Sequence, residues 1–490
     1  MSSIYTPKGL YIDGAWVGTP DSLPVINPAD ESVIASAPVG TGAHADAAIA
    51  AARRAFDSGD WSHLAPKARQ AILQRFVDAS RARAEDIKAL LVAEVGATQR
   101  LIAAIQFEIP LRHAQHCVDL TLRDPVTPLP IAINPVGRGS LLGAGVMIRE
   151  PVGVVTAITP YNFPFYLNIG KVMQALAVGC TVVLKPSPYT PLTALILGEI
   201  AEAAGLPHGV LNIVTGEADV GEKLTTDPRI DLISFTGSDK VGALIQAQAA
   251  PTLKRCLLEL GGKSALIVRH DADIKSSAVI GSAFTVHCGQ GCALTTRHLV
   301  HNAVRAEYVA ALKAQVEKMT IGDPQDPKVV IGPLIREAAR ARTETYAALA
   351  LDEGATLVTG GARPEALKKG FFYKPTIFDN VQNSNRVARE EIFGPIACVI
   401  GFDSDEEAIA LANDSEFGLS GAIQSADAAK AYEMALRIRT GGLTINGGTG
   451  NPLESTYPFG GVKRSGYGRE NGIEGLNEYT YIKTIGFHAA

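Results

Sequence analysis

The length and composition of this chain exclude several classes of protein. It has 490 residues, 47% hydrophobic and 19% charged, and a formal net charge of -5. These values are typical of a globular protein of two or three domains, and we find no basic face that favours nucleic acid or an anionic membrane. Six cysteines are too few for a disulfide framework, and no His/Cys cluster indicates a metal site. Because we see neither a membrane span nor a signal sequence, we expect a cytoplasmic protein.

Strand and helix patterns alternate along most of the chain. Short apolar runs between turns predict a β-ribbon over residues 10–40, and helical periodicity follows over residues 45–120. Short, nearly all-apolar strands separated by helices then indicate a parallel sheet with both faces covered, in which ligands bind at the carboxyl ends of the strands. These strands are predicted at residues 152–158, 181–184, 211–214 and 231–235.

A proline-rich stretch over residues 123–150 interrupts the helical pattern. Its prolines exclude a helix interior and suit an edge, so we expect a β-arm that leaves the body of its domain. A second α/β block is expected over about residues 260–450, and a final strand over residues 479–485.

Cys292 is the candidate nucleophile. Gly289 and Gly291 precede it, so little side-chain bulk surrounds its sulfur and a carbonyl carbon could reach it. The thiolate is the strongest nucleophile among common side chains. Taken alone, however, an isolated cysteine is more often a small buried hydrophobe.

Four other residues stand in patterns that suit catalysis or the binding of a nucleotide. Asn162 lies between two prolines, where its amide is a rigid oxyanion donor or simply a turn residue. Glu259 lies in an apolar run, and burial there would raise its pKa toward that of a general base. Lys185 follows a strand and could reach a ribose or phosphate, or be solvated. Gly237 opens a helix, where backbone N–H groups could face a phosphate, although a plain turn is an equal alternative.

Seven motifs resemble, in order, those of the NAD(P)-dependent aldehyde dehydrogenase superfamily of the hydrolytic type. The resemblance covers nearly the whole chain, and the set is specific although each member is not. The motifs are Thr-Pro-Tyr-Asn-Phe-Pro at 159–164, Lys-Pro-Ser at 185–187, Phe-Thr-Gly-Ser at 235–238, Leu-Glu-Leu-Gly-Gly-Lys at 258–263, Gly-Gln-Gly-Cys at 289–292, Glu-Ile-Phe-Gly-Pro at 391–395, and Pro-Phe-Gly-Gly-Val-Lys-Arg-Ser-Gly-Tyr-Gly-Arg-Glu at 458–470.

The resemblance implies a role for each catalytic residue. Cys292 would attack the aldehyde carbonyl, and the Asn162 amide and the Cys292 backbone N–H would hold the oxyanion. Hydride transfer to the nicotinamide would leave a thioester, which Glu259 would hydrolyse by activating water. Lys171 and Glu470 match positions that form a proton path from that base to solvent.

The resemblance also implies an NAD site and a substrate tunnel. Pro188 stands where NAD-preferring members often carry Glu, so NADP use is also expected to be possible. Small residues at the tunnel predict space for an apolar aldehyde. The cofactor residues are Ile158, Thr159, Pro160, Lys185, Ser187, Pro188, Phe235, Gly237, Ser238, Gly242, Leu260, Gly261, Glu391 and Phe393; the substrate residues are Phe163, Tyr166, Leu167, Gly170, Gly291, Ala293, Leu453 and Phe459.

We therefore expect an α/β fold of the aldehyde dehydrogenase type. It would have a Rossmann-type cofactor domain (1–123 and 150–259), a catalytic domain (260–455), and an oligomerisation arm (124–149) that pairs with the tail (456–490). We expect a homodimer or homotetramer. The expected activity is oxidation of a medium-chain, branched or aromatic aldehyde to its acid. The alternatives are a semialdehyde dehydrogenase, possibly CoA-acylating, and an inactive structural or binding homologue.

Overall fold

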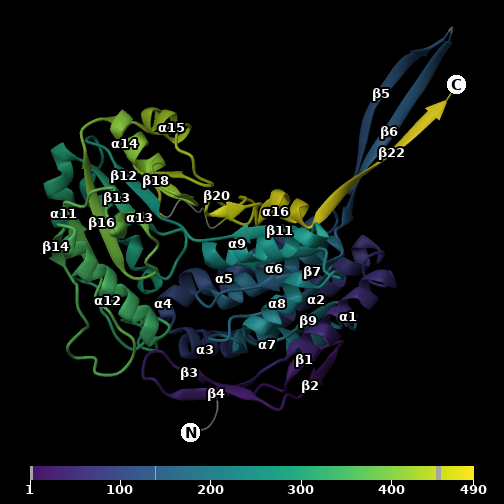
Figure 1. Cartoon of the computed structure of the whole chain (residues 1–490), viewed down its shortest axis with the longest axis horizontal. Helices are drawn as coiled ribbons and strands as arrows, with labels where there is room; N and C mark the ends of the chain where they lie inside the picture. Colours follow the sequence, from purple (N-terminus) through teal and green to yellow (C-terminus); the bar gives the residue numbers. More distant parts are fainter. Residues whose placement is uncertain (1–3, 138, 449–453, 490) are drawn as a thin grey trace.

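The computed structural model describes residues 4–137, 139–448 and 454–489. Two large sheets form its two halves, and a long β-arm leaves one of them (Figure 1). The strands and helices alternate as the sequence predicts, so the expected α/β fold is confirmed.

The first sheet has eight strands, five of them parallel. Four of the parallel strands are the predicted apolar ones, and the fifth, at residues 255–259, was not predicted as a strand. Antiparallel strands close both edges. Along the sheet the order is β2 (Ala15–Val17), β1 (Leu10–Ile12), β9 (Leu211–Ile213), β8 (Thr181–Lys185), β7 (Val154–Ile158), β10 (Leu232–Thr236), β11 (Arg255–Glu259) and β21 (Gly466–Tyr467). Asp13 and Gly14 join β1 to β2 with φ of 53° and 73°, the conformation that a tight hairpin turn requires.

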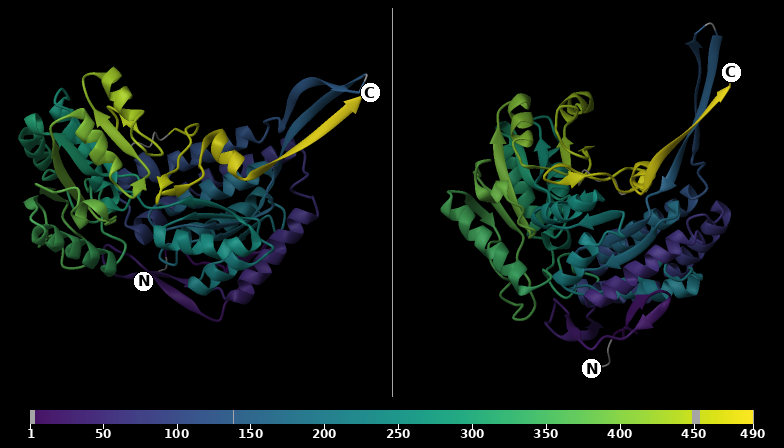
Figure 2. Two further views of the ribbon diagram at one scale, coloured as in Figure 1. Left: turned by 45° about the horizontal axis from the view of Figure 1, so that its top comes forward. Right: turned by 45° about the vertical axis from the view of Figure 1, so that its right-hand side comes forward.

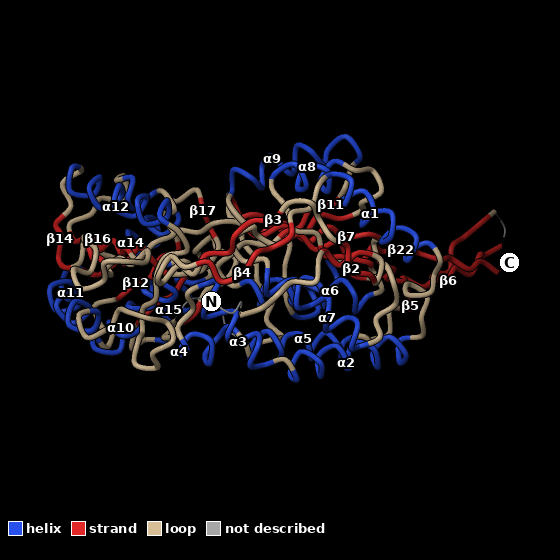
Figure 3. Tube along the Cα trace, turned by 90° about the horizontal axis from the view of Figure 1, so that it is seen from below, coloured by secondary structure: helices blue, strands red, loops and turns tan. Residues whose placement is uncertain are grey.

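Helices cover both faces of this sheet, which explains its apolar strands (Figure 3). Successive residues of β8 show the alternation: Val182 and Leu184 pack into one core, and Val183 packs into the other. One face is covered by α1 (Gly42–Asp57), α8 (Ala218–Thr226) and α9 (Asp239–Ala249); the other is covered by α2 (Pro66–Ala82), α3 (Ala84–Val95), α5 (Glu108–Leu120), α6 (Pro164–Val178) and α7 (Leu192–Ala204). A short α4 (Gln99–Leu101) and a π-helical turn, η1 (Ile102–Gln106), connect α3 to α5.

The second sheet has seven strands and its own two cores. Its order is β14 (Thr356–Thr359), β15 (Thr376–Asp379), β16 (Ile396–Phe402), β13 (Thr295–His301), β12 (Ser264–Val268), β18 (Gly421–Gln424) and β19 (Thr444–Ile445). One core includes α10 (Ile274–Gly281) and α11 (Asn302–Val316); the other includes α12 (Glu337–Asp352), α13 (Arg386–Arg389), α14 (Asp405–Asn413) and α15 (Ala428–Ala435). The chain passes from the first sheet to the second between Glu259, the end of β11, and Ser264, the start of β12.

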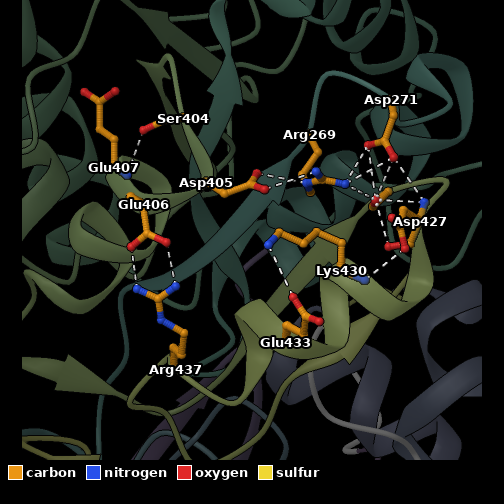
Figure 4. Close-up of polar contacts among 11 residues, drawn as sticks. Arg269, Asp271, Ser404, Asp405, Glu406, Glu407, Asp427, Lys430, Glu433 and Arg437 are labelled. Carbon is orange, nitrogen blue, oxygen red and sulfur yellow. Dashed lines mark hydrogen bonds and ion pairs between the residues drawn. The ribbon is translucent and has the colours of Figure 1, made fainter.

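A charged network fastens the end of β12 to the helices beside it (Figure 4). The Arg269 guanidinium donates from Nε to Asp405 at 2.9 Å, at the start of α14, and its Nη1 donates to Asp271 at 3.1 Å. Ser425 Oγ joins the same cluster. Arg269 is thus the cation shared by both carboxylates, and no group of acidic, His or Cys residues in the described chain could hold a metal ion.

The arm is a three-stranded antiparallel sheet that extends beyond the helices (Figures 1 and 2). Strand β6 (Gly139–Pro151) lies between β5 (Val126–Val136) and β22 (Thr480–Ala489), so the predicted pairing of arm and tail is observed. The preceding part of the tail lies in the body: β21 pairs with β11, β20 (Val462–Lys463) pairs with β17 (Phe417–Gly418), and α16 (Gly472–Glu478) packs on α6. A separate hairpin is formed by β3 (Ser22–Ile26) and β4 (Val33–Pro38). None of the helices of the described residues is long and apolar enough to cross a membrane.

Glu94 is a buried carboxylate whose oxygens are both satisfied. It accepts hydrogen bonds from the backbone N–H groups of Leu192 and Thr193, each at 2.9 Å, at the start of α7. Pro191, the N-cap residue, has no side-chain cap to offer, so a residue distant in sequence caps this helix. Burial raises the pKa of Glu94 to about 7.

We predict that Glu94→Ala loosens the start of α7. Two buried N–H groups lose their acceptor, which costs about 1–3 kcal/mol locally. Hydrogen–deuterium exchange at residues 192 and 193 should therefore accelerate by about tenfold or more. Glu85→Ala is the matched control, because Glu85 lies on the exposed face of α3, the helix that also carries Glu94. Equal exchange in both variants would show that Glu94 does not hold the helix.

Candidate active site

The predicted catalytic residues meet where the parallel strands of the first sheet end. Thr159 follows β7, Lys185 is the last residue of β8, and Glu259 is the last residue of β11. Glu259 is paired in register with Thr236, the end of β10. Their common edge is the side at which parallel sheets bind ligands.

Cys292 lies on the connection between η3 (Ser282–Gly289) and β13, opposite this edge. It is partly exposed, and Gly262 packs so closely that a Cβ there would lie 2.4 Å from the Cys292 carbonyl oxygen. Burial raises the pKa of the Cys292 thiol to about 12, and the carboxylates of Glu391 and Glu259 add to the rise. Without a ligand, the thiol is therefore protonated at neutral pH.

The turn before Cys292 has an unusual backbone. His287 and Cys288 have φ of 50° and 54°, the left-handed region, and Gly289 follows with 76°. Non-glycine residues adopt this conformation at an energetic cost, and such strain clusters at functional sites. His287 is buried, which lowers its pKa to about 4, so it supplies no positive charge to stabilise a thiolate.

Asn162 lies within hydrogen-bonding reach of this turn. Its Nδ2 donates to the Gln290 carbonyl at 2.8 Å, two residues before the nucleophile. An amide nitrogen has two N–H groups, so one is free to meet an oxyanion formed at Cys292.

Glu259 is a buried carboxylate without a hydrogen-bond partner. It is 2% exposed, and neither carboxylate oxygen is bonded to any residue that the structure describes. Burial raises its pKa well above the ordinary value, and the Glu470 charge adds to the rise. Gly460 leaves room for it, because a Cβ there would lie 2.7 Å from Glu259 Oε1. A poised carboxylate of this kind suits a general base.

Lys171 and Glu470 form a buried ion pair beside that base. Lys171 Nζ donates to Glu470 and also, at 3.0 Å, to Ser234 Oγ, which lies 3.0 Å from Tyr479 Oη. The pair acts on Glu259 through its charges without bonding to it directly. Sequence reasoning overlooked Ser234 and Tyr479 here; a hydroxyl inside the apolar strand β10 was the available signal.

The predicted cofactor residues combine a buried cation with a helix N-terminus. Lys185 is buried, and its ammonium forms no ion pair with the described residues. Ser238 caps α9, and Gly242 allows α9 to approach Leu260, since a Cβ there would lie 2.6 Å from Leu260 Cδ2. A buried cation and a helix N-terminus at the same edge of the sheet fit an anionic nucleotide.

Glu391 closes the same region from the second sheet. Its Oε1 accepts from the Gly262 N–H at 2.9 Å, burial raises its pKa to about 7, and Gly261 leaves space for it. A cavity here is lined by Gly262, Gly291, Glu391 and Phe393 among others. The remaining predicted cofactor residues lie on the adjoining segments: Ile158, Thr159 and Pro160 at the end of β7, Ser187 and Pro188 after β8, Phe235 on β10, and Gly237 after it.

The predicted substrate residues form one face of α6. Tyr166, Leu167 and Gly170 are partly exposed, as is Phe163 at the N-cap, whereas most of the helix is buried. A Cβ on Gly170 would meet no atom within 4 Å, so this face borders open space. Tyr166 Oη is held 3.1 Å from His113 Nδ1.

The other substrate residues lie on the nucleophile segment and the tail. Gly291 and Ala293 flank Cys292 and are partly exposed. Phe459 is fixed by a backbone hydrogen bond of 2.7 Å to the Glu470 carbonyl. Leu453 lies outside the described residues.

Comparisons with known proteins agree along the whole chain. A model described as the aldehyde dehydrogenase family matches residues 16–485. A 3-succinoylsemialdehyde-pyridine dehydrogenase of a Pseudomonas species is 38% identical over 484 residues, 98% of either chain, and betaine aldehyde dehydrogenase of Bacillus subtilis is 38% identical over 97% of this chain and 96% of its own. A solved betaine aldehyde dehydrogenase of Staphylococcus aureus in complex with NAD+ has a TM-score of 0.93 at 36% identity, with 98% of this chain and 94% of that chain covered. The solved NAD+ complex of a Mycobacterium tuberculosis aldehyde dehydrogenase has a TM-score of 0.92 at 39% identity. The match covers 99% of this chain and 98% of that chain.

We predict that alkylation of Cys292 by iodoacetamide, without cofactor, is strongly pH-dependent. Because its pKa is raised to about 12, the thiolate fraction should grow about tenfold per pH unit between about pH 7 and pH 9. Peptide mass spectrometry measures the rate at each cysteine. Cys288, which is fully buried, serves as the internal control and should stay unlabelled. A rate at Cys292 that is flat across this range would show that the thiolate is already formed.

Proposed function

Because the chain belongs to the aldehyde dehydrogenase family, we propose that it oxidises an aldehyde to a carboxylic acid through a covalent adduct on Cys292. The observation that carries this proposal is the pairing of a partly exposed cysteine with a buried, unpartnered carboxylate at Glu259. A nucleophile forms the acyl-enzyme, and a base is then needed for its hydrolysis.

The cofactor of this proposal is NAD+, with NADP+ as the second possibility. Lys185, the N-terminus of α9 and Glu391 would hold it, and NAD+ complexes of two relatives support the choice. When bound, the nicotinamide accepts the hydride. Pro188 neither bonds to a ribose hydroxyl through its side chain nor repels a 2′-phosphate, so discrimination against NADP+ has no evident source at this position.

The protein residues would divide the two half-reactions between them. Cys292 Sγ attacks the carbonyl carbon, and the free N–H of Asn162 together with the Cys292 backbone N–H stabilises the oxyanion. After oxidation to the thioester, Glu259 takes a proton from water, which attacks the acyl carbon and releases the acid. The buried chain of Lys171, Glu470, Ser234 and Tyr479 then offers a route for that proton.

An apolar aldehyde is the proposed substrate class. The exposed face of α6 presents aromatic and aliphatic side chains and the open space at Gly170, and it carries no Arg or Lys to pair with a carboxylate. The Pseudomonas relative is named for a substrate with a pyridine ring, which supports an aromatic aldehyde here. The CoA-acylating alternative is disfavoured, because a placed base favours water over a thiol as acyl acceptor.

The proposed setting is a cytoplasmic homo-oligomer, with the tetramer favoured over the dimer. Strands β5 and β22 leave their outer edges unpaired, and the arm exposes Ile131, Ile133 and Phe487. Unpaired edges and exposed apolar residues together favour pairing with a second copy.

We predict that Glu259→Gln separates the two half-reactions. The variant should retain a pre-steady-state burst of NADH with hexanal, because hydride transfer precedes hydrolysis. Its steady-state rate should fall by about 10²–10⁴-fold, the usual effect of losing a general base. Glu474→Gln, an exposed substitution on α16, is the control. An unchanged steady-state rate in Glu259→Gln would remove this residue from the role.

We predict that Gly170→Trp shifts the chain-length preference toward short aldehydes. An indole would occupy the open space beside α6, and each excluded methylene loses about 0.8 kcal/mol of favourable transfer. The ratio of kcat/KM for hexanal to that for acetaldehyde should fall by about tenfold or more. Gly18→Trp, where an added Cβ also meets no atom within 4 Å, controls for the bulk of the residue. An unaltered ratio in Gly170→Trp would contradict the placement of the tunnel.

A further inference from the structure

Gln106 is a buried amide at the end of the π-helical turn η1. Its side chain is completely shielded from solvent. A π-helical turn is rare, and such turns occur frequently at functional sites. Burial of an amide is unfavourable unless it is hydrogen-bonded, so its contacts indicate what this turn is for.

The Gln106 side chain reaches the turn that carries Asn162. Its Nε2 donates to the Asn162 carbonyl at 3.1 Å, while its Oε1 has no partner among the described residues. The next residue, Phe163, packs against the strained turn before Cys292, because its ring lies 5.6 Å from that of His287. The Asn162 peptide carbonyl is therefore held by η1, and the residue beside it contacts the nucleophile turn.

This contact bears directly on the direction of the Asn162 side chain. The peptide carbonyl is fixed by Gln106, and the side-chain Nδ2 is fixed by the Gln290 carbonyl at 2.8 Å. With both ends held, the second N–H of the amide can point in one direction only. The start of this turn, three residues before Asn162, is also fixed by α6, because Thr159 Oγ1 donates to Asn168 Oδ1 at 2.6 Å.

We propose that Gln106 is a positioning residue that aims the Asn162 amide at the oxyanion formed on Cys292. It acts through Asn162 and does not contact the reacting atoms. The inference rests on the proposed function, since it needs an oxyanion at that position. An electrostatic donor works only when it is held in place before the reaction, and a displacement of about 1 Å can cost about 10²-fold in rate.

Gln106→Met removes the donor while keeping the length of the side chain. The test measures the single-turnover rate of NADH formation with hexanal and with hexanal deuterated at the aldehyde carbon, so that the isotope effect identifies hydride transfer. This rate should fall between about tenfold and 10²-fold, with the Kd for NAD+ unchanged. Gln115→Met is the matched control: its amide bonds to Gln74 and lies outside the Asn162 network.

Gln106→Glu supplies a readout that a purely structural role would not move. An ionised carboxylate repels the Asn162 carbonyl, whereas the protonated acid can donate to it as the amide does. The hydride-transfer rate of this variant, divided by that of the parent at each pH, should therefore rise as the pH falls from about 8 to about 6, since burial raises the pKa of a carboxyl. This variant also decides the question if the Met variant fails to fold.

The outcomes separate the two levels of the proposal. A parent protein that forms no NADH with any aldehyde would contradict the proposed function itself. The role of Gln106 alone would be overturned by a different set of results. The parent would form NADH at a normal rate, Gln106→Met would react within about twofold of that rate, and the rate ratio of Gln106→Glu would not change with pH.

Discussion

The burial of negative charge at Glu259 is the constraint on which the rest of this site depends. A carboxylate that is 2% exposed and lacks any hydrogen-bond partner in the described chain is expensive to ionise. Burial raises the pKa of the Cys292 thiol, and the carboxylates of Glu391 and Glu259 add to the rise. Lys171 and Arg469 oppose the rise at Glu259, so a counter-charge stays close to the base. Glu94 is the contrasting case: it is also fully buried, but two backbone N–H groups satisfy it and it serves the fold.

The fold brings these groups together by ending its parallel strands at one edge. The first sheet supplies Asn162, Lys185 and Glu259 from the ends of three strands. The second sheet supplies Cys292 just before β13 and Glu391 just before β16. The nucleophile and base therefore come from different halves of the molecule. Their relation depends on the close packing at Gly262, where a side chain would collide with the Cys292 carbonyl.

Much of this could be predicted from sequence, because burial and spacing leave clear patterns. The apolar strands and the arm followed from periodicity and prolines, and the candidate catalytic residues followed from motif resemblance. The limits have physical causes. Glu94 and Glu259 give the same signal, a carboxylate in an apolar run, and only their partners distinguish them. The π-helical turn and the contact of Gln106 with Asn162 join residues 56 positions apart, which no local pattern encodes. The left-handed turn at His287 and Cys288 is a tertiary effect, since two successive non-glycine residues rarely adopt that backbone without support from the surrounding structure.

The most direct test of a covalent mechanism at Cys292 is to observe the acyl-enzyme. Glu259→Gln, incubated with hexanal and NAD+ and quenched in acid during the burst, would be digested and analysed by peptide mass spectrometry. The account predicts one hexanoyl group on the peptide that contains Cys292, in proportion to the NADH formed, and none on the peptide in a Cys292→Ala background. NADH formation without an acylated Cys292, or acylation of Cys288 in its place, would contradict it.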